Sequence, residues 1–238
     1  MSIVVENLSK TYGAQKAIDG ISFQTAPGSV VGFLGPNGAG KSTTMKILTC
    51  YIPQTSGTAS VCDFDVSTRS MEVRRHIGYL PEHNPLYLEM YVREALTFIG
   101  AIHQVENPQK RIDEVIELCG LGEEQNKKIS ALSKGYRQRV GLAQAIFADP
   151  KVLILDEPTS GLDPNQVIGI RNLITELGKT KTVILSTHIM QEVEAVCEQV
   201  IIISKGKIVA DDKLSSLKEA HLNKSLEDIF IELTGLGV

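Results

Sequence analysis

The 238-residue sequence lacks the long apolar runs that membrane-spanning segments require. No stretch approaches the roughly 18 consecutive apolar residues expected of a transmembrane helix. The first residues, Met1 to Glu6, contain no charged segment followed by an apolar stretch, so a secretory leader is not indicated. We therefore expect a protein that neither spans a membrane nor is exported.

The sequence also lacks clusters of charge of one sign. Its formal net charge is −4, and no run of five like charges occurs. Proteins that bind DNA or RNA through phosphates usually present a basic face, so we expect no nucleic-acid partner. The four cysteines form no Cys-x-x-Cys pair, which disfavours a structural metal site and favours reduced, mostly buried thiols.

Apolar strand-like runs alternate with helical patterns along most of the chain. This alternation predicts an α/β fold with a mainly parallel sheet, and the length permits one large domain that carries a subdomain. The expected strands are 3–8, 17–23, 30–34, 58–61, 152–155, 182–186 and 200–204. The expected helices outside the subdomain are 43–49, 164–177, 190–197 and 225–234.

Two regions depart from this alternation. The first strands are short and predict an N-terminal antiparallel layer that leads into the strand 30–34. The region 83–148 is helical instead, because apolar residues recur at helical spacing, and we interpret it as an inserted helical subdomain. The residues at this spacing include Ile112, Val115, Ile116 and Cys119.

The segment Gly35 to Ser42 matches the pattern G-x-x-x-x-G-K-[ST] and follows the apolar run Val30 to Leu34. A strand before this loop and a helix after it form the context in which the pattern binds nucleotide phosphates. Backbone N–H groups would face the phosphates. Lys41, which we expect to be exposed, would add positive charge, and Ser42 would bind Mg²⁺. The predicted nucleotide-binding residues here are Gly35, Pro36, Asn37, Gly38, Ala39, Gly40, Lys41, Ser42 and Thr43.

Two acidic residues end the apolar run Val152 to Leu155. Ligands of an open parallel sheet bind beyond the carboxyl ends of its strands, so Asp156 and Glu157 should lie at the same rim as the phosphate loop. We expect Asp156 to bind Mg²⁺, directly or through water, and Glu157 to act as the general base that polarises the attacking water. Without the phosphate loop, this acidic pair would be interpreted as a solvated strand end.

Two further motifs indicate phosphate contacts. His188 follows the apolar run Thr182 to Ser186, so a contact with the γ-phosphate is preferred to a helix cap or a surface histidine. Ser133 is a natural N-cap, and with Gly135 it places amide groups at the start of a helix. This second anion site lies more than 90 residues from the phosphate loop.

Together, these motifs resemble the ATP-binding subunits of ATP-binding-cassette (ABC) transporters over essentially the whole chain. The resemblance implies a P-loop NTPase (RecA-like) core, with residues 1–238 as one ATP-binding domain and 205–238 as its C-terminal strand and helices. The family's Walker A loop corresponds to Gly35 to Ser42 and its Walker B strand to Val152 to Glu157. The signature corresponds to Leu132 to Gln138, the D-loop to Ser160 to Asp163, and the switch histidine to His188.

The resemblance also implies how the chain works. Tyr12 occupies the position where the family places an aromatic ring against adenine. In this family, the phosphate loop and signature of one subunit are too far apart to share a nucleotide. Two chains in a head-to-tail homodimer would therefore enclose two ATP molecules, with Ser133 and Gly135 contacting the ATP bound by the partner. Closure would follow ATP binding, and release would follow hydrolysis.

The sequence differs from the family pattern at two positions. Lys134 replaces the first glycine of the usual Leu-Ser-Gly-Gly-Gln signature, whereas Ser133 and Gly135 remain. Glu82 stands where the family commonly has glutamine, and a carboxylate can bind Mg²⁺ or water but cannot donate a hydrogen bond. Both variants and the C-terminal segment 225–234 resemble the ABC-2 type exporter branch, which includes multidrug efflux and gliding-motility-associated systems.

We therefore expect an ATPase that couples hydrolysis to a separate transmembrane permease, located in the cytoplasm at the inner face of the cell membrane. The loop His83 to Tyr91 is suited to receive a helix from this permease. One alternative is a soluble ABC-class motor acting on DNA or the ribosome, although no coiled coil, zinc module or second cassette is visible. Another is a P-loop small-molecule kinase, which leaves the signature, the D-loop and His188 unexplained.

Overall fold

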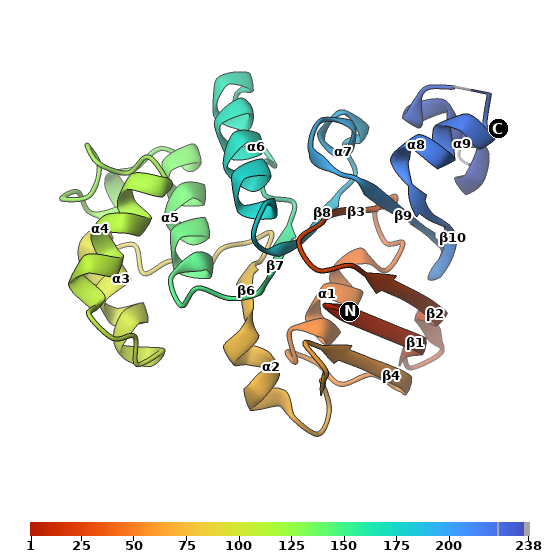
Figure 1. Cartoon of the computed structure of the whole chain (residues 1–238), viewed down its shortest axis with the longest axis horizontal. Helices are drawn as coiled ribbons and strands as arrows, with labels where there is room; N and C mark the ends of the chain where they lie inside the picture. The colour runs from red at the N-terminus through yellow and green to blue at the C-terminus, as the bar shows by residue number, and fades with distance from the viewer. Residues whose placement is uncertain (223, 236–238) are drawn as a thin grey trace.

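The computed structural model describes residues 1–222 and 224–235. This part of the chain contains two sheets, an inserted helical region and a pair of C-terminal helices (Figure 1). The strands are β1 (Ile3–Tyr12), β2 (Gln15–Thr25), β3 (Val30–Leu34), β4 (Ser56–Val61), β5 (Phe64–Asp65), β6 (Ile77–Leu80), β7 (Val152–Asp156), β8 (Thr182–Thr187), β9 (Gln199–Ser204) and β10 (Lys207–Lys213). The helices are α1 (Lys41–Leu48), α2 (Ser70–His76), α3 (Val92–Ile102), α4 (Pro108–Leu118), the 3-10 turn η1 (Ile129–Ala131), α5 (Lys134–Ile146), α6 (Pro164–Gly178), α7 (Met190–Val196), α8 (Leu214–Ala220) and α9 (Leu226–Thr234).

The larger sheet has the strand order β10-β9-β3-β8-β7-β6. Its neighbouring strands are parallel except for the antiparallel pair of β9 and β10. Every residue of β3, β7 and β8 is buried, as expected when both faces of a parallel sheet are covered. The structure thus confirms the predicted α/β fold with a mainly parallel sheet.

The smaller sheet is the predicted N-terminal antiparallel layer, with the strand order β2-β1-β4-β5. Helix α1 packs between this layer and the larger sheet. Its buried residues Met45 and Leu48 share one hydrophobic core with Val5 of β1 and Ile154 of β7. This packing fixes the direction of α1, so that its N-terminus lies at the end of β3.

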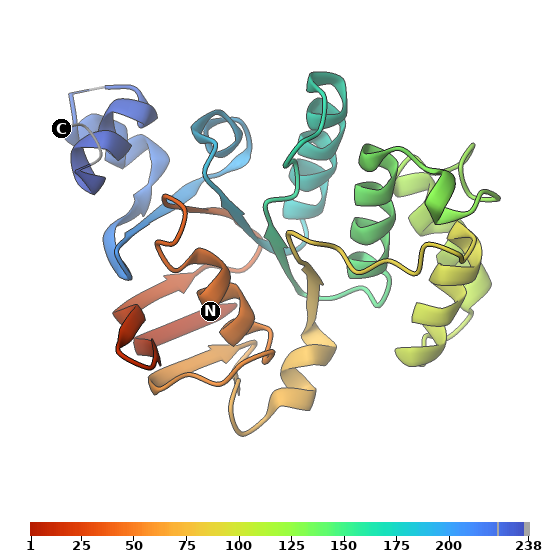
Figure 2. The same cartoon turned by 180° about the vertical axis from the view of Figure 1, so that it is seen from behind.

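Helices α3, α4 and α5 form the predicted helical region at one end of the molecule (Figure 1). The stripe Ile112, Val115, Ile116 and Cys119 is buried in the core that this region shares with the larger sheet. The helical spacing recognised in the sequence is therefore confirmed. Figure 2 shows the chain between β6 and α3 crossing from the sheet to this region.

The structure also contains elements that the sequence pattern did not predict. Helix α2 has one buried residue, Val73, and β6 has four residues, so neither produces a strong apolar period. Strands β1 and β2 extend beyond their predicted bounds, because their polar ends at Tyr12 and Gln15 pair across a turn at Gly13. Gly13 has a φ of 57°, which glycine adopts without strain.

The C-terminal helix α9 packs on the core as its sequence pattern indicates. Ser225 caps it, because its Oγ accepts a hydrogen bond from the N–H of Asp228 at 3.1 Å. Leu226, Ile229 and Phe230 are buried. Residues 223 and 236–238, which belong to the predicted C-terminal segment, lie outside the described residues.

A close contact between β6 and α5 gives the first prediction. A Cβ atom at Gly78 would lie 2.9 Å from the carbonyl carbon of Ala145 and closer still to its oxygen. Because backbone atoms must move to admit it, Gly78→Ala should lower the free energy of unfolding by about 1–3 kcal/mol in urea titrations. Gly122→Ala is the matched control, since a Cβ atom there meets nothing within 4 Å. Equal urea midpoints for the Gly78→Ala and Gly122→Ala variants would contradict the close packing of Gly78 on Ala145.

Candidate functional site

The phosphate loop joins β3 to α1, and its conformation depends on glycine. Gly38 and Gly40 have φ values of 77° and 114°, which disfavour residues with side chains. A Cβ atom at Gly35 would meet the backbone oxygen of Ile203. Helix α1 begins at Lys41, so the N–H groups of its first turn, which have no partners within the helix, face the loop. The segment can therefore bind phosphate through backbone N–H groups.

Lys41 is buried, with 7% of its surface exposed, which corrects the expectation of an exposed loop lysine. Its Nζ donates hydrogen bonds to the carbonyl oxygens of Gly35 at 2.7 Å and Pro36 at 3.3 Å. The Oε1 atom of Glu157 lies 3.8 Å from the same Nζ. Burial lowers the pKa of Lys41, while nearby carboxylates, Glu157 first, oppose this effect. The lysine is buried because it is the first residue of a helix packed between two sheets.

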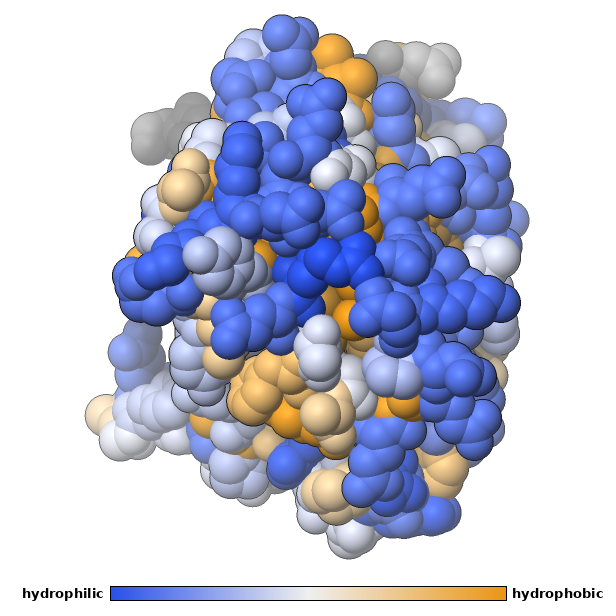
Figure 3. Space-filling model, turned by 90° about the vertical axis from the view of Figure 1, so that its left-hand side faces the viewer, coloured by the Kyte–Doolittle hydropathy of each residue, from blue (hydrophilic) through white to orange (hydrophobic). Residues whose placement is uncertain are grey.

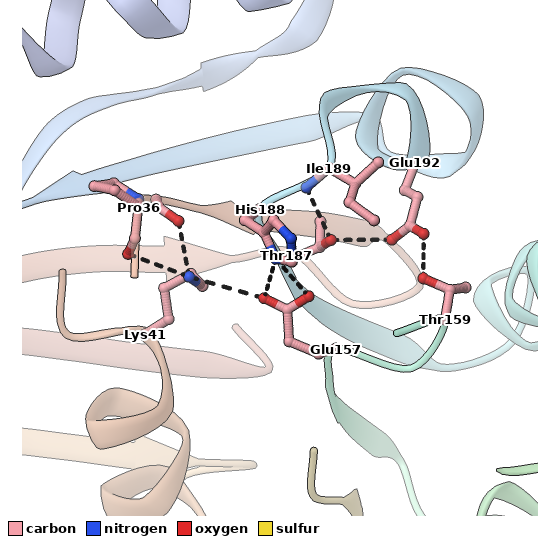
Figure 4. Close-up of polar contacts among 9 residues, drawn as sticks. Pro36, Lys41, Glu157, Thr159, Thr187, His188, Ile189 and Glu192 are labelled. Carbon is pink, nitrogen blue, oxygen red and sulfur yellow. Dashed lines mark hydrogen bonds and ion pairs between the residues drawn. The ribbon is translucent and has the colours of Figure 1, made fainter. Parts of the chain in front are cut away.

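The carboxylate of Glu157 lies between Lys41 and His188 (Figure 4). Nδ1 of His188 is 3.0 Å from both carboxylate oxygens of Glu157. Because a carboxylate only accepts hydrogen bonds, Nδ1 must carry the proton in this contact. The Glu157 side chain is buried, whereas 49% of the His188 side chain is exposed. The structure thus brings together the three residues predicted to be catalytic.

Backbone geometry at the end of β7 turns Glu157 toward the rim. Its N–H donates to the carbonyl oxygen of Ser186 at 2.8 Å, which extends the pairing of β7 and β8 by one residue. Its φ of 51° is left-handed, a region that residues with side chains rarely adopt. The chain therefore turns sharply at this residue, and the N–H of Ser160 donates back to the carbonyl oxygen of Glu157 at 3.2 Å.

Asp156, Ser42 and Glu82 offer oxygen atoms suited to Mg²⁺. Asp156 is buried at the end of β7, and its Oδ1 has no hydrogen-bond partner among the described residues. All three residues line the same cavity. In the described part of the chain, no group of three or more His, Cys, Asp or Glu side chains could hold a metal alone. Mg²⁺ usually takes one or two carboxylates and completes its shell with water and phosphate, so the carboxylates of Asp156 and Glu82 with the Ser42 hydroxyl form a suitable set of donors.

A cavity of about 430 Å³ lies beside the phosphate loop. The antiparallel layer contributes one wall, where the Tyr12 ring is half exposed and Lys10 Nζ lies 5.2 Å from its centre. Glu82, Glu157 and His188 also line this cavity. The complete lining is Tyr12, Gln15, Ala17, Asn37, Gly38, Gly40, Lys41, Ser42, Thr43, Glu82, Glu157 and His188. Gln15 and Ala17 of β2 were missed in the sequence, where they belong to no motif.

The signature residues lie elsewhere in the same chain. Ser133 caps α5, because its Oγ accepts a hydrogen bond from the N–H of Tyr136 at 3.4 Å. Gly135 is buried beneath the side-chain amide of Gln166, which leaves no room for a Cβ atom. Among the described residues that line the phosphate-loop cavity, none belongs to the segment 132–138. One chain therefore does not bring its phosphate loop and its signature to a common cavity.

A second cavity, of about 730 Å³, separates the sheet from the helical region. Its walls include Tyr79 of β6 and Pro81 just after it, together with Ile99 of α3 and His103, the residue that follows α3. Ser42 and Glu82 line both this cavity and the one beside the phosphate loop. Figure 3 shows the adjoining end of the molecule, where an apolar patch lies among hydrophilic side chains. Exposed apolar residues of α3 and the loop before it are Tyr87, Leu88, Tyr91, Phe98 and Ile102.

Comparisons with known proteins identify the family. A family model described as ABC transporter matches residues 18–160. An uncharacterized ABC transporter ATP-binding protein of Bacillus subtilis (strain 168) is 39% identical over 217 residues, which cover 90% of this chain and 72% of that protein. The bacitracin transport ATP-binding protein of Bacillus licheniformis is 37% identical over 225 residues, covering 93% and 73% of the two chains. The chain belongs to the ABC transporter family, as the sequence motifs indicated.

Solved structures agree with this assignment. The ATP-binding subunit of an ABC transporter has a TM-score of 0.89 and 28% identity, covering 98% of this chain and all of that one. A dimeric ATP-binding cassette in a post-hydrolysis state, bound to ADP and Pi, has a TM-score of 0.82 and 25% identity, covering 89% and 98%. The chain is thus an ATPase with a P-loop NTPase core, and it serves as the ATP-binding subunit of a membrane transporter.

The buried Lys41 gives the second prediction. Lys41→Met retains a long apolar side chain but removes the charge, so MgATP affinity should fall more than about tenfold in calorimetry because a charge-assisted phosphate contact is lost. The thermal midpoint should stay close to wild type, since the buried stem remains. Lys46→Met, on the same helix but outside the phosphate-loop cavity, is the control. Wild-type affinity of Lys41→Met would exclude its role in phosphate binding.

Proposed function

We propose that the chain is the ATPase of an exporter, and that it acts as a head-to-tail homodimer on a separate transmembrane permease. A relative named for Nod factor export supports the direction of transport, and relatives named for bacitracin transport and linearmycin resistance are consistent with it. The observation that carries the chain's ATPase role is the contact of Lys41, Glu157 and His188 at one rim of the sheet, beside Asp156 Oδ1, which has no hydrogen-bond partner among the described residues.

The proposed roles of the site residues follow from their positions. Backbone N–H groups of the loop and the Lys41 ammonium bind the β- and γ-phosphates, and the half-exposed Tyr12 ring stacks on adenine. Ser42, Asp156 and Glu82 would hold Mg²⁺, which would neutralise charge on the phosphate oxygens. The triphosphate would then occupy the cavity beside the phosphate loop, which Lys41, Ser42 and Glu82 line, while Asp156 reaches the metal from the adjoining cavity.

Glu157 is the proposed general base. Its carboxylate accepts a proton from the attacking water, while the N–H of His188 Nδ1 keeps the carboxylate oriented toward the rim. The imidazole Nε2 faces away from this contact and can donate to a γ-phosphate oxygen only when it also carries a proton, since phosphate oxygens only accept hydrogen bonds. The exposed edge of His188 allows this contact, whereas the buried Glu157 is shielded from bulk water.

The proposed homodimer explains why one chain separates its motifs. Ser133 and Gly135 lie outside their own chain's phosphate-loop cavity, so they are available to the ATP of a second chain. Each chain supplies one phosphate loop and one signature. Two identical chains would therefore complete two sites, and a second, different ATPase is not required. Solved dimeric cassettes among the structural relatives support this arrangement.

The proposed permease contact lies in the cavity between the sheet and the helical region. Its mixed lining, apolar at Ile99 and Pro85 and polar at His83 and Asn84, suits an amphipathic helix of a partner. No helix of the described residues is long and apolar enough to cross a membrane. The transporter relatives support a location in the cytoplasm at the inner membrane face, where the permease would hold the protein. A motor acting on DNA or the ribosome is disfavoured by the transporter relatives.

The third prediction tests the homodimer and the base together. Glu157→Gln keeps the size of the side chain but removes its basicity, so turnover should fall at least about 100-fold while MgATP produces a stable dimer in gel filtration. Adding Ser133→Arg to this variant should restore the monomer, because a bulky cation would occupy the trans phosphate position. A monomer with Glu157→Gln alone, or undiminished turnover, would contradict the proposal.

The fourth prediction concerns Glu82, which lines both cavities. If it transmits the nucleotide state to the permease, Glu82→Gln should retain ATPase activity within several-fold, because the amide oxygen still binds Mg²⁺ or water. Glu82→Ala should lower basal hydrolysis by several-fold at most, because Ser42 and Asp156 still bind Mg²⁺, but it should lose most of the stimulation by permease in proteoliposomes. Full stimulation of the alanine variant would remove Glu82 from the coupling path.

A further inference from the structure

Helix α7 contains a buried carboxylate that the proposed mechanism does not use. Glu192 lies in the first turn of α7, and only 1% of its surface is exposed. In the described part of the chain, no lysine, arginine or histidine forms an ion pair with it. A buried carboxylate is unfavourable unless hydrogen bonds compensate it, so its partners are informative.

Two threonine hydroxyl groups supply that compensation (Figure 4). Thr187 Oγ1 donates to Glu192 Oε2 at 3.0 Å, and Thr159 Oγ1 donates to Glu192 Oε1. Thr187 Oγ1 also accepts a hydrogen bond from the N–H of Ile189 at 3.1 Å. A hydroxyl group has one hydrogen to donate, so the network runs in one direction and ends on the carboxylate.

The two threonines belong to the two segments that carry the predicted catalytic residues. Thr159 lies two residues after Glu157, in the turn that follows β7, and Thr187 directly precedes His188 at the end of β8. Both threonines are buried. Glu192 therefore joins, through one side chain, the backbone segments that hold Glu157 and His188.

The link formed by Glu192 matters because the contact between Glu157 and His188 depends on the backbone conformation at Glu157. The left-handed φ of Glu157 is sparsely populated and persists only where surrounding contacts hold it. Beyond β7, the turn is held by the 2.8 Å bond from the N–H of Glu157 to Ser186 and the 3.2 Å bond from the N–H of Ser160. The Thr159–Glu192 bond adds a side-chain tie from α7, an element outside the turn.

We propose that Glu192 is a positioning residue for ATP hydrolysis. By accepting hydrogen bonds from Thr159 and Thr187, it fixes the position of the Glu157 turn relative to the His188 segment. The proposal rests on the proposed roles of Glu157 as base and His188 as its partner. Glu192 is not among the described residues that line the phosphate-loop cavity, and in the described part of the chain it forms no hydrogen bond with Glu157 or His188, so it acts through the two threonines.

Glu192→Gln is the principal test, because it preserves volume but replaces one acceptor with an amide donor. One threonine hydroxyl then loses its acceptor. We expect kcat to fall at least tenfold, while KM for ATP and the calorimetric Kd for MgADP remain within threefold of wild type. Glu194→Gln is the matched control on the same helix, since Glu194 pairs instead with Lys218 at 2.6 Å, and it should keep wild-type kcat.

Measuring Glu192→Gln in a His188→Ala background distinguishes a positioning role of Glu192 from a general loss of stability. If Glu192 acts through the His188–Glu157 contact, Glu192→Gln should reduce kcat by less than threefold further when His188→Ala is already present. The proposal would be overturned if the fold-reductions in kcat of the two single variants multiplied in the double variant. It would also be overturned by a normal kcat in folded Glu192→Gln. Undiminished turnover of His188→Ala and Glu157→Gln alone would instead show that the proposed catalytic roles are wrong.

Thr187→Val tests the same network from its other side and keeps the proposal falsifiable if Glu192→Gln does not fold. Valine preserves the shape of threonine but removes the hydroxyl group that donates to Glu192. We expect the same fall in kcat with unchanged MgADP affinity, and Thr175→Val, at an exposed position of α6, should have no effect. A fully active Thr187→Val variant would contradict the positioning role.

Discussion

The structure depends on the parallel pairing of β3, β8 and β7, because this pairing places three chemically active strand ends at one rim. In parallel strands, the carboxyl ends meet at the same edge of the sheet. Leu34 pairs with Thr187, and Asp156 pairs with Ser186. The residues after these positions therefore converge although the sequence separates them widely. A slip of one residue would turn alternate side chains to the opposite face and separate the acidic residues from the phosphate loop.

Convergence at this rim creates an electrostatic constraint. Lys41 and Glu157 are both buried, and each would be costly to bury alone. The loop carbonyl groups and the carboxylate compensate the ammonium group, while the ammonium and the His188 N–H compensate the carboxylate. The lowered pKa of Lys41 shows that burial outweighs the attraction of the nearby acids. Additional negative charge from phosphate is therefore favourable at this lysine.

The sequence predicted the parallel sheet, the helical region and the phosphate loop because apolar periods and glycine spacing are local signals. It did not predict the burial of Lys41, which results from packing α1 between two sheets. Glu192 gave no usable signal either. An acidic residue in the first turn of a helix is ordinary on a protein surface, since it complements the helix dipole. Only the folded structure shows that this carboxylate is enclosed by two threonines from other segments.

The packing of α5 on β6 gives the site a mechanical connection to the surface. Gly78 admits the Ala145 carbonyl so closely that a methyl group would not fit, and interiors of this density transmit displacement. Helix α5 begins at the signature, and β6 leads two residues later to Glu82. In the proposed dimer, a movement of α5 on contact with the second chain would therefore be transmitted to β6. Because Glu82 lines both cavities, such a movement would reach the phosphate site and the proposed permease groove together.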